Sequence, residues 1–236
     1  MKAHGGHITC VHTVGVLPVA PDPTTATTEA EALVDEEEAA HEFRKTVEAG
    51  LDGAGVDWTW LRFYGHPATI LIERSRFADV IVMSADDSFP SISSGALHAR
   101  TAVLAVRQRN PNFIPERPAL IVWNGSVPAA NAVHGAMPMF EATQPVHGLA
   151  VDDDSREYPA SLVQEYLVEH EIESEVHWRP SEGEAVVDAI LECAEEMGIG
   201  MIVAGAFGYN RLREMMLGSV TRQLMGKSSR PLFLSH

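Results

Sequence analysis

The sequence predicts an α/β protein made of two Rossmann-like, doubly wound parallel-sheet domains. Short apolar runs alternate with amphipathic stretches along most of the 236 residues, which is typical of a parallel sheet covered by helices. The plan also occurs twice, because FADVIVMS at 77–84 matches IGMIVAG at 199–205, each after a helical stretch of similar length. Such self-similarity indicates an internal duplication.

The first half contains alternating strand and helix signals. The apolar or alternating runs predict strands at 8–17, 56–64, 80–83 and 101–106. The amphipathic stretches predict helices at 29–53 and 65–77, separated from the strands by a Pro- and Thr-rich loop at 18–28 and a polar loop at 85–94. The residues expected to face inward on these helices are Ala32, Leu33, Ala39, Ala40, Phe43, Val47, Leu51, Ile70, Leu71 and Phe77.

The second half repeats this plan with an additional strand and helix in front. Apolar runs predict strands at 119–123, 146–151, 173–178, 201–204 and 232–234, and amphipathic stretches predict helices at 128–140, 158–170, 184–197 and 220–225. Three prolines between 110 and 118 mark a linker. We therefore expect domains at 1–110 and 118–236, joined by residues 111–117.

The composition limits the possible partners. Asp and Glu number 33 against 17 Lys and Arg, a formal net charge of −16, which argues against nucleic acid and anionic membranes because both attract clustered basic residues. No apolar run is long enough to span a bilayer. Cys10 and Cys193 lie in apolar runs and are expected to be small core residues without a disulfide. We expect a cytoplasmic protein.

A glycine pattern follows the strand at 201–204. Gly205 and Gly208 precede Gly218 and Ser219, and Ser219 stands where a helix N-cap belongs, before Val220 and Thr221. Glycines let the backbone approach an anion, and a helix N-terminus attracts phosphate. The spacing matches neither the Walker nor the compact dinucleotide motif. From the residues alone, a phosphate cradle and a ligand-free turn with a capped helix are equally open.

The second half resembles a universal stress protein domain over nearly its whole length. The matching segments are ALIVWNGS, HGLAVDD, the helix and strand over AVVDAILECAEEMGIGMIVAG, and GAFGYNRLREMMLGSVT with the ending RPLFLSH. In that family G-x2-G-x9-G-[ST] is an ATP-binding signature, and it is complete here. The whole chain resembles tandem members, in which two such domains pack as a pseudo-dimer through their terminal strands.

The resemblance implies ATP, with Mg²⁺, as the ligand of the second domain. It places the phosphates and ribose on Gly205, Gly208, Gly218, Ser219, Val220 and Thr221, the nucleoside on Val122, Trp123 and Asn124, and the adenine near Val151. Many members have aspartate where this chain has Asn124, which keeps a carbonyl acceptor but loses the charge. Trp123 beside it is bulky.

The first half departs from the family pattern. Ser84 and Asp87 replace the first two glycines, and Asp86 adds a second carboxylate that would repel a triphosphate. We therefore expect this half to have lost nucleotide binding. The run ITCVHTV matches the family's second strand, so the first strand and helix have no counterpart. Without the first strand, the family's second and fourth strands either pair directly or leave an open slot between them. We therefore expect a shortened tandem protein, which arose by natural loss or reflects a misplaced start.

Other clusters carry weaker signals. His4, His7 and His12 are spread over a tail and a strand without a cysteine or a fixed turn, so a metal site is not expected there. Asp152–Asp154 are expected to be solvated loop charges, with Mg²⁺ binding beside a triphosphate as the alternative. Arg211 and Arg213 are expected at the surface, with a γ-phosphate contact as the alternative. We therefore predict no metal-ligating residues in the protein. No nucleophile–base signature is present, so a dedicated enzyme is not indicated.

Three functions therefore stay open. The sequence favours a stress-response regulatory protein that binds ATP and acts on an unidentified protein partner. The alternatives are a nucleotide-free interaction module and a weak ATPase. Association of two chains through exposed sheet edges is also left open.

Overall fold

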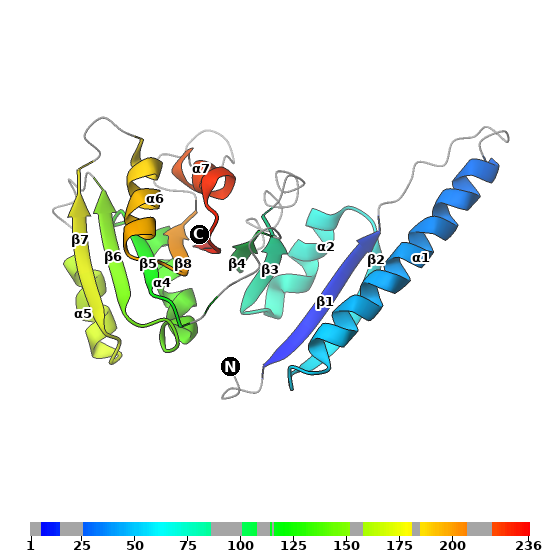
Figure 1. The fold of residues 1–236 in the computed structure, drawn as a ribbon, viewed down its shortest axis with the longest axis horizontal. Coiled ribbons are helices and arrows are strands. Elements are labelled where there is room, and N and C mark those ends of the chain that lie inside the picture. Colours follow the sequence, from blue (N-terminus) through cyan, green and yellow to red (C-terminus); the bar gives the residue numbers. More distant parts are fainter. Residues whose placement is uncertain are drawn as a thin grey trace. The chain divides into compact units, whose positions relative to one another are not determined.

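The protein is described by a computed structural model over residues 6–14, 26–85, 101–107, 114, 116–151, 158–180, 185–206 and 219–236, without the side chains of 26–36 and 219. These residues form an α/β fold with mainly parallel strands (Figure 1). Two compact units divide the chain, at 1–70 and 71–236. The predicted domain boundary at 111–117 is a different division and stays a prediction.

The first unit is a two-stranded parallel sheet with a long helix. Strands β1 (His7–Val14) and β2 (Asp57–Tyr64) pair in parallel, and α1 (Ala26–Leu51) connects them. The Phe43 ring of α1 lies 6.0 Å from the rings of both His12 and Trp60. An ion pair of 2.9 Å between Arg62 and Glu37 also joins β2 to α1.

Several predicted core positions of this part are wrong. Ala40 is buried and Val47 and Leu51 are half-buried, but Ala39 is exposed and Phe43 is 54% exposed. A sheet of only two strands covers a narrow stripe of α1, so the full apolar face of the helix is not buried.

Phe77 is also misplaced by the helical pattern. Helix α2 (Pro67–Arg74) buries Ile70, but a 3-10 turn (Ser75–Phe77) follows it. The change from 3.6 to about 3 residues per turn moves the following side chains off the buried face, and Phe77 is fully exposed.

The second unit is organised around a seven-stranded sheet with the order β3-β4-β9-β8-β5-β6-β7 (Figure 1). Its strands are β3 (Val80–Ser84), β4 (Ala102–Val106), β5 (Ala119–Trp123), β6 (Val146–Val151), β7 (Ser174–Arg179), β8 (Met201–Gly205) and β9 (Leu232–Ser235). Among the pairs that these described strands form, β4–β9 alone is antiparallel. The helices are α4 (Val127–Phe140), α5 (Ser161–Glu169), α6 (Val186–Glu196) and α7 (Ser219–Lys227). All elements match the predicted ones to within a few residues.

Among the described strands, the first half has no counterpart of β5. In the second half β5 lies between β6 and β8. The corresponding strands of the first half, β1 and β3, belong to two separate sheets of the described residues. Of the two arrangements that the sequence leaves open, direct pairing of these strands is therefore not formed.

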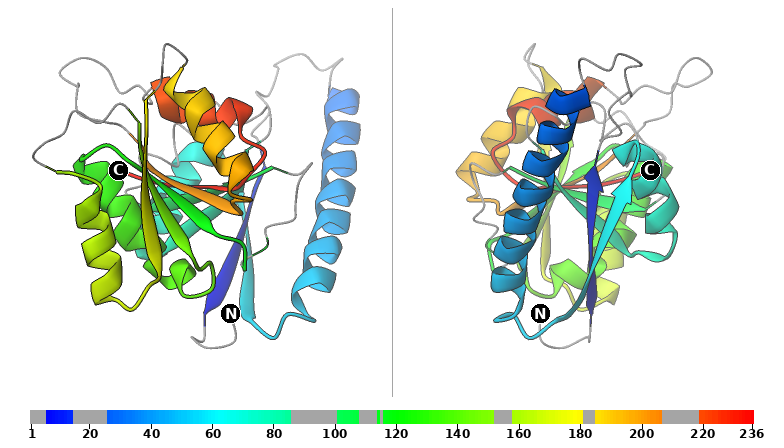
Figure 2. Two further views of the ribbon diagram at one scale, coloured as in Figure 1. Left: turned by 60° about the vertical axis from the view of Figure 1, so that its left-hand side comes forward. Right: turned by 90° about the vertical axis from the view of Figure 1, so that its right-hand side faces the viewer.

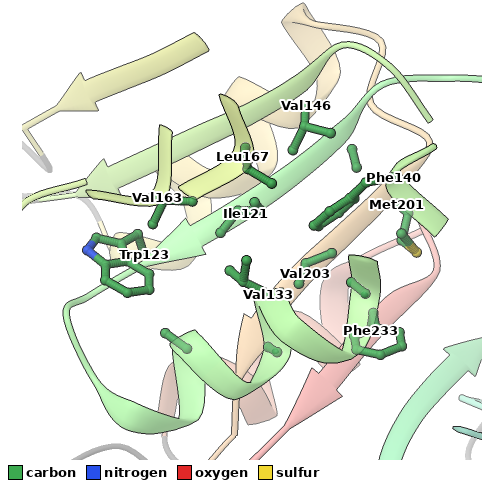
Figure 3. Packing of buried hydrophobic residues seen from close by; sticks show 14 of the residues in the cluster. Ile121, Trp123, Val133, Phe140, Val146, Val163, Leu167, Met201, Val203 and Phe233 are labelled. Atoms are coloured by element: carbon green, nitrogen blue, oxygen red, sulfur yellow. The ribbon is translucent and has the colours of Figure 1, made fainter. Parts of the chain in front are cut away.

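Helices cover both faces of the seven-stranded sheet (Figure 2). Side chains of α4 and α5 pack on one face, around Phe140, Leu167 and Phe233 (Figure 3). Side chains of α6 and α7 pack on the other, around Ile190, Ile202 and Leu224. Cys193 is fully buried in α6, Cys10 of the first unit is half-buried, and both are free thiols, as predicted.

Replacement of Phe233 by alanine is expected to lower the free energy of unfolding by about 3–5 kcal/mol, because a fully buried ring would leave a cavity. Phe77→Ala, the same change at a fully exposed ring, is expected to alter it by less than about 0.5 kcal/mol. Urea denaturation followed by circular dichroism measures both. Equal effects of the two changes would contradict the placement of β9 in the core.

Candidate functional site

The carboxyl ends of β5 and β8 form the switch point of the sheet. The two strands are adjacent and parallel, with Val122 opposite Ala204. From β5 the chain passes into α4 on one face, whereas the helices before and after β8 pack on the other face. In doubly wound sheets this divergence of the connections leaves a crevice in which ligands bind.

Gly205 is required by the close approach of α4 to the end of β8. A Cβ atom at this position would lie 2.6 Å from the backbone nitrogen of Ala129 and 2.8 Å from the carbonyl carbon of Pro128. Both are backbone atoms, so no side-chain movement could relieve the overlap. The first turn of α4 can therefore reach the end of β8 only if residue 205 is glycine.

The start of α7 is fixed to the same strand end. The buried hydroxyl of Thr221 donates a hydrogen bond of 3.2 Å to the carbonyl oxygen of Gly205. Ser219 is the first residue of α7, as the N-cap pattern predicts within one residue. The first N–H groups of α7, which have no partner within the helix itself, therefore lie beside the carboxyl end of β8. Gly208 and Gly218 lie outside the described residues.

Asn124 builds the turn between β5 and α4. Its Oδ1 atom accepts hydrogen bonds from the Ser126 hydroxyl at 2.6 Å and the Ser126 backbone N–H at 3.2 Å. The Ser126 hydroxyl in turn accepts from the backbone N–H of Ala129 and caps α4. The Oδ1 atom of Asn124 thus stabilises the turn, and the side-chain NH₂ group of Asn124 has two N–H donors.

The other predicted side chains divide between the two faces. Trp123 is buried on the α4–α5 face, and its Nε1 donates a 2.8 Å hydrogen bond to the carbonyl oxygen of Tyr158 (Figure 3). Val122, Val151 and Val220 are half-buried and pack on the α6–α7 face. The structure therefore places the three valines on the face that α7 covers and the Trp123 ring on the opposite face.

Other predicted positions lie outside the described residues. These are Asp86 and Asp87 of the first half, Asp152–Asp154, Arg211 and Arg213, and His4. The expected loss of nucleotide binding in the first half stays a prediction, and Ser84 is placed at the end of β3.

A histidine pair at the β6–β7 edge was not predicted. Nδ1 of His147 lies 3.1 Å from Nε2 of His177, and the Glu175 carboxylate lies within 3.9 Å of both nitrogens. Burial lowers the pKa of His147, as does the neighbouring His177, while Glu175 opposes them. The sequence signal for this cluster is the alternation Glu175-x-His177, which puts both side chains on one face of a strand. That His147 lies beside them follows only from the register between β6 and β7.

The larger unit is therefore a doubly wound α/β domain with the start of a helix at its switch point. Residues 117–236 match the family model described as the universal stress protein family. This match covers half of the chain, and the chain belongs to that family.

Two solved structures share the fold over nearly the whole chain. A universal stress protein from Archaeoglobus fulgidus aligns over 97% of this chain and 87% of its own, with a TM-score of 0.74 and 23% identity. A Pseudomonas aeruginosa protein assigned to the same family aligns over 96% of this chain and 92% of its own, with a TM-score of 0.59 and 11% identity.

A curated universal stress protein from Methanocaldococcus jannaschii is 36% identical over 47 residues. The match spans 20% of this chain and 29% of that relative. Among the described helices none has the length and apolar character needed to cross a membrane.

Gly205→Ala is expected to lower the free energy of unfolding by about 1–3 kcal/mol, because the added methyl group overlaps the backbone of α4. The matched control is Gly226→Ala in α7, where a Cβ meets nothing within 4 Å and alanine favours the helix by up to about 1 kcal/mol. Chemical denaturation measures both. A neutral Gly205→Ala would show that α4 does not contact the strand end.

The lowered pKa of His147 predicts a pH dependence of stability. Below the unfolded pKa, near 6.5, the unfolded chain binds a proton that the folded chain does not, so the free energy of unfolding falls as the pH falls. Urea midpoints in a chelator-containing buffer at pH 7.5 and 5.5 measure the loss. His147→Gln is expected to reduce it, whereas His134→Gln, at an exposed histidine on α4, leaves it unchanged. An equal loss in all three proteins would exclude His147 as its source.

Proposed function

We propose that residues 118–236 bind ATP together with Mg²⁺, and that the protein acts in the cytoplasm as a stress-response regulator whose contacts with a partner depend on the bound nucleotide. One observation carries the proposal. The Thr221–Gly205 hydrogen bond fixes the N-terminus of α7 at the carboxyl end of β8, next to the end of β5. Free N–H groups at a switch point are a favourable environment for phosphates.

The residues around the carboxyl ends of β5 and β8 suggest which part of the nucleotide each segment would contact. The start of α7, with Ser219, Val220 and Thr221, is suited to the phosphates through backbone N–H groups. The Thr221 hydroxyl already serves the β8 carbonyl oxygen, so its contribution is to place the helix. The valine side chains at 122, 151 and 220 offer an apolar wall on the same face.

Asn124 suggests how this chain would hold the nucleoside without an aspartate. Its carbonyl oxygen is occupied by the two groups of Ser126. The amide N–H groups are the donors available to a ribose oxygen, whereas an aspartate would accept from a ribose hydroxyl. We therefore propose that the amide of Asn124 donates to the ribose.

Magnesium is expected to be bound mainly by the triphosphate. Mg²⁺ commonly needs only one or two protein carboxylates in nucleotide sites. The aspartates at 152–154 follow β6, whose carboxyl end lies on the same edge of the sheet as the end of β5. Because these aspartates are expected to stay solvated, we propose that the ion is held through the phosphates and water.

Calorimetric titration of nucleotide-free protein with Mg-ATP tests the proposal. We expect micromolar affinity, about −8 kcal/mol. Gly218→Asp is expected to weaken it at least about tenfold, because a carboxylate at the helix start repels the phosphates and tenfold corresponds to only about 1.4 kcal/mol. Gly226→Asp adds the same charge at the far end of α7, where a side chain has open space, and is expected to bind nearly as the original chain.

The outcomes separate the alternatives. Absence of binding at millimolar Mg-ATP would contradict the proposal and leave an interaction module without nucleotide. If Gly218→Asp and Gly226→Asp weaken ATP binding equally, the nucleotide binds elsewhere on the protein. If the protein releases phosphate from ATP and Gly218→Asp abolishes that release, the protein is an ATPase.

A further inference from the structure

Three side chains with metal-binding atoms converge on one face of the β6–β7 edge. His147 of β6 stands directly opposite Glu175 of β7 in the strand register, and His177 follows two residues later on the same face. Their nearest ligand atoms lie within 4.8 Å of one another. His147 is buried, His177 is half-buried and Glu175 is exposed, so the group is open to solvent on one side.

The spacing of these atoms is close to that of a tetrahedral metal site. Zinc–nitrogen bonds of about 2.0–2.1 Å at a tetrahedral angle place two ligand atoms about 3.3 Å apart. Nδ1 of His147 and Nε2 of His177 are 3.1 Å apart. The Glu175 Oε2 atom lies 3.9 and 3.8 Å from these nitrogens. These two distances exceed the expected ligand separation of about 3.3 Å by about 0.5 Å. A small rotation of the exposed Glu175 side chain can bring its carboxylate that much closer.

The backbone already holds the two imidazoles in position. Parallel pairing fixes His147 relative to Glu175, and Leu149 opposite His177 belongs to the core that α6 covers. Without a metal, the two ring nitrogens share one hydrogen bond. Each neutral imidazole can carry its proton on the nitrogen that faces away from the other ring. Nδ1 of His147 and Nε2 of His177 then both offer a lone pair to a metal, and neither ring loses its proton.

We propose that Nδ1 of His147, Nε2 of His177 and the carboxylate of Glu175 form a Zn²⁺-binding site on the β6–β7 edge. Two imidazoles and one carboxylate suit zinc, whereas Mg²⁺ prefers an octahedral shell of oxygen atoms. Three protein ligands leave the fourth position to water on the exposed side. The bound ion would join the edge strand β7 to β6.

This zinc site is separate from the proposed nucleotide site. His147 is the second residue of β6 and Val151 is the last, four residues or about 13 Å further along the strand. His147 and Glu175 are thus each the second residue of their strand, near its amino end, and the proposed ATP site lies at the carboxyl ends. Zinc binding does not depend on ATP binding, so either proposal can fail without the other.

Titration of chelator-treated protein with ZnCl₂, followed by calorimetry, tests the site. We expect one zinc per chain at this site with a micromolar dissociation constant. Glu175→Gln and His177→Gln are each expected to weaken binding at least about tenfold, because loss of one of three ligands removes more than the 1.4 kcal/mol that tenfold represents. These variants spare the buried His147, and circular dichroism checks that they fold.

His134→Gln, which changes an exposed histidine on the opposite face, is the control and is expected to bind zinc as the unchanged protein does. X-ray absorption of the zinc-loaded protein is expected to show two imidazole ligands at about 2.0–2.1 Å. No zinc binding at millimolar concentration would overturn the proposal. So would zinc affinity that is the same in His177→Gln and His134→Gln, since the ion would then bind at other histidines.

Discussion

The position of β9 between β8 and β4 is the constraint on which the sheet of the larger unit depends. On one side β9 pairs in parallel with β8, and on the other it pairs antiparallel with β4 from the first half of the chain. Arg107, directly after β4, also donates hydrogen bonds of 2.7 and 2.6 Å to the carbonyl oxygens of Met225 and Gly226 at the end of α7. One short strand therefore satisfies two edges that would otherwise expose unpaired backbone groups.

The same sheet separates two different chemistries along its strands. At the carboxyl ends, glycine at 205 lets α4 approach, and Thr221 holds α7 against the strand. Toward the amino ends of β6 and β7, alternation along the strand places imidazoles and a carboxylate on one face. The first environment offers backbone N–H groups, which suit phosphate, and the second offers nitrogen lone pairs, which suit a metal.

Much of the fold could be predicted because buried parallel strands are continuous apolar runs and their helices are amphipathic. Ala119–Trp123 and Val146–Val151 were predicted to the residue. Phe43 and Phe77 were not, since their exposure depends on the width of the two-stranded sheet and on a 3-10 turn. At the candidate site, the sequence could predict which residues end β5, β6 and β8, because each follows an apolar run. The Ser126 groups bound by Asn124 and the pairing of His147 with Glu175 depend on turn geometry and register, which single residues do not encode.

The proposed ATP site lies at the carboxyl ends of β5 and β8. Hydrogen–deuterium exchange with and without Mg-ATP is the decisive measurement for this site, because N–H groups bound to phosphate exchange slowly. We predict slower exchange at 219–221 and 124–126, with 174–179 of β7 unchanged. Exchange that slows elsewhere while 219–221 stay unchanged, although ATP is bound, would contradict the account.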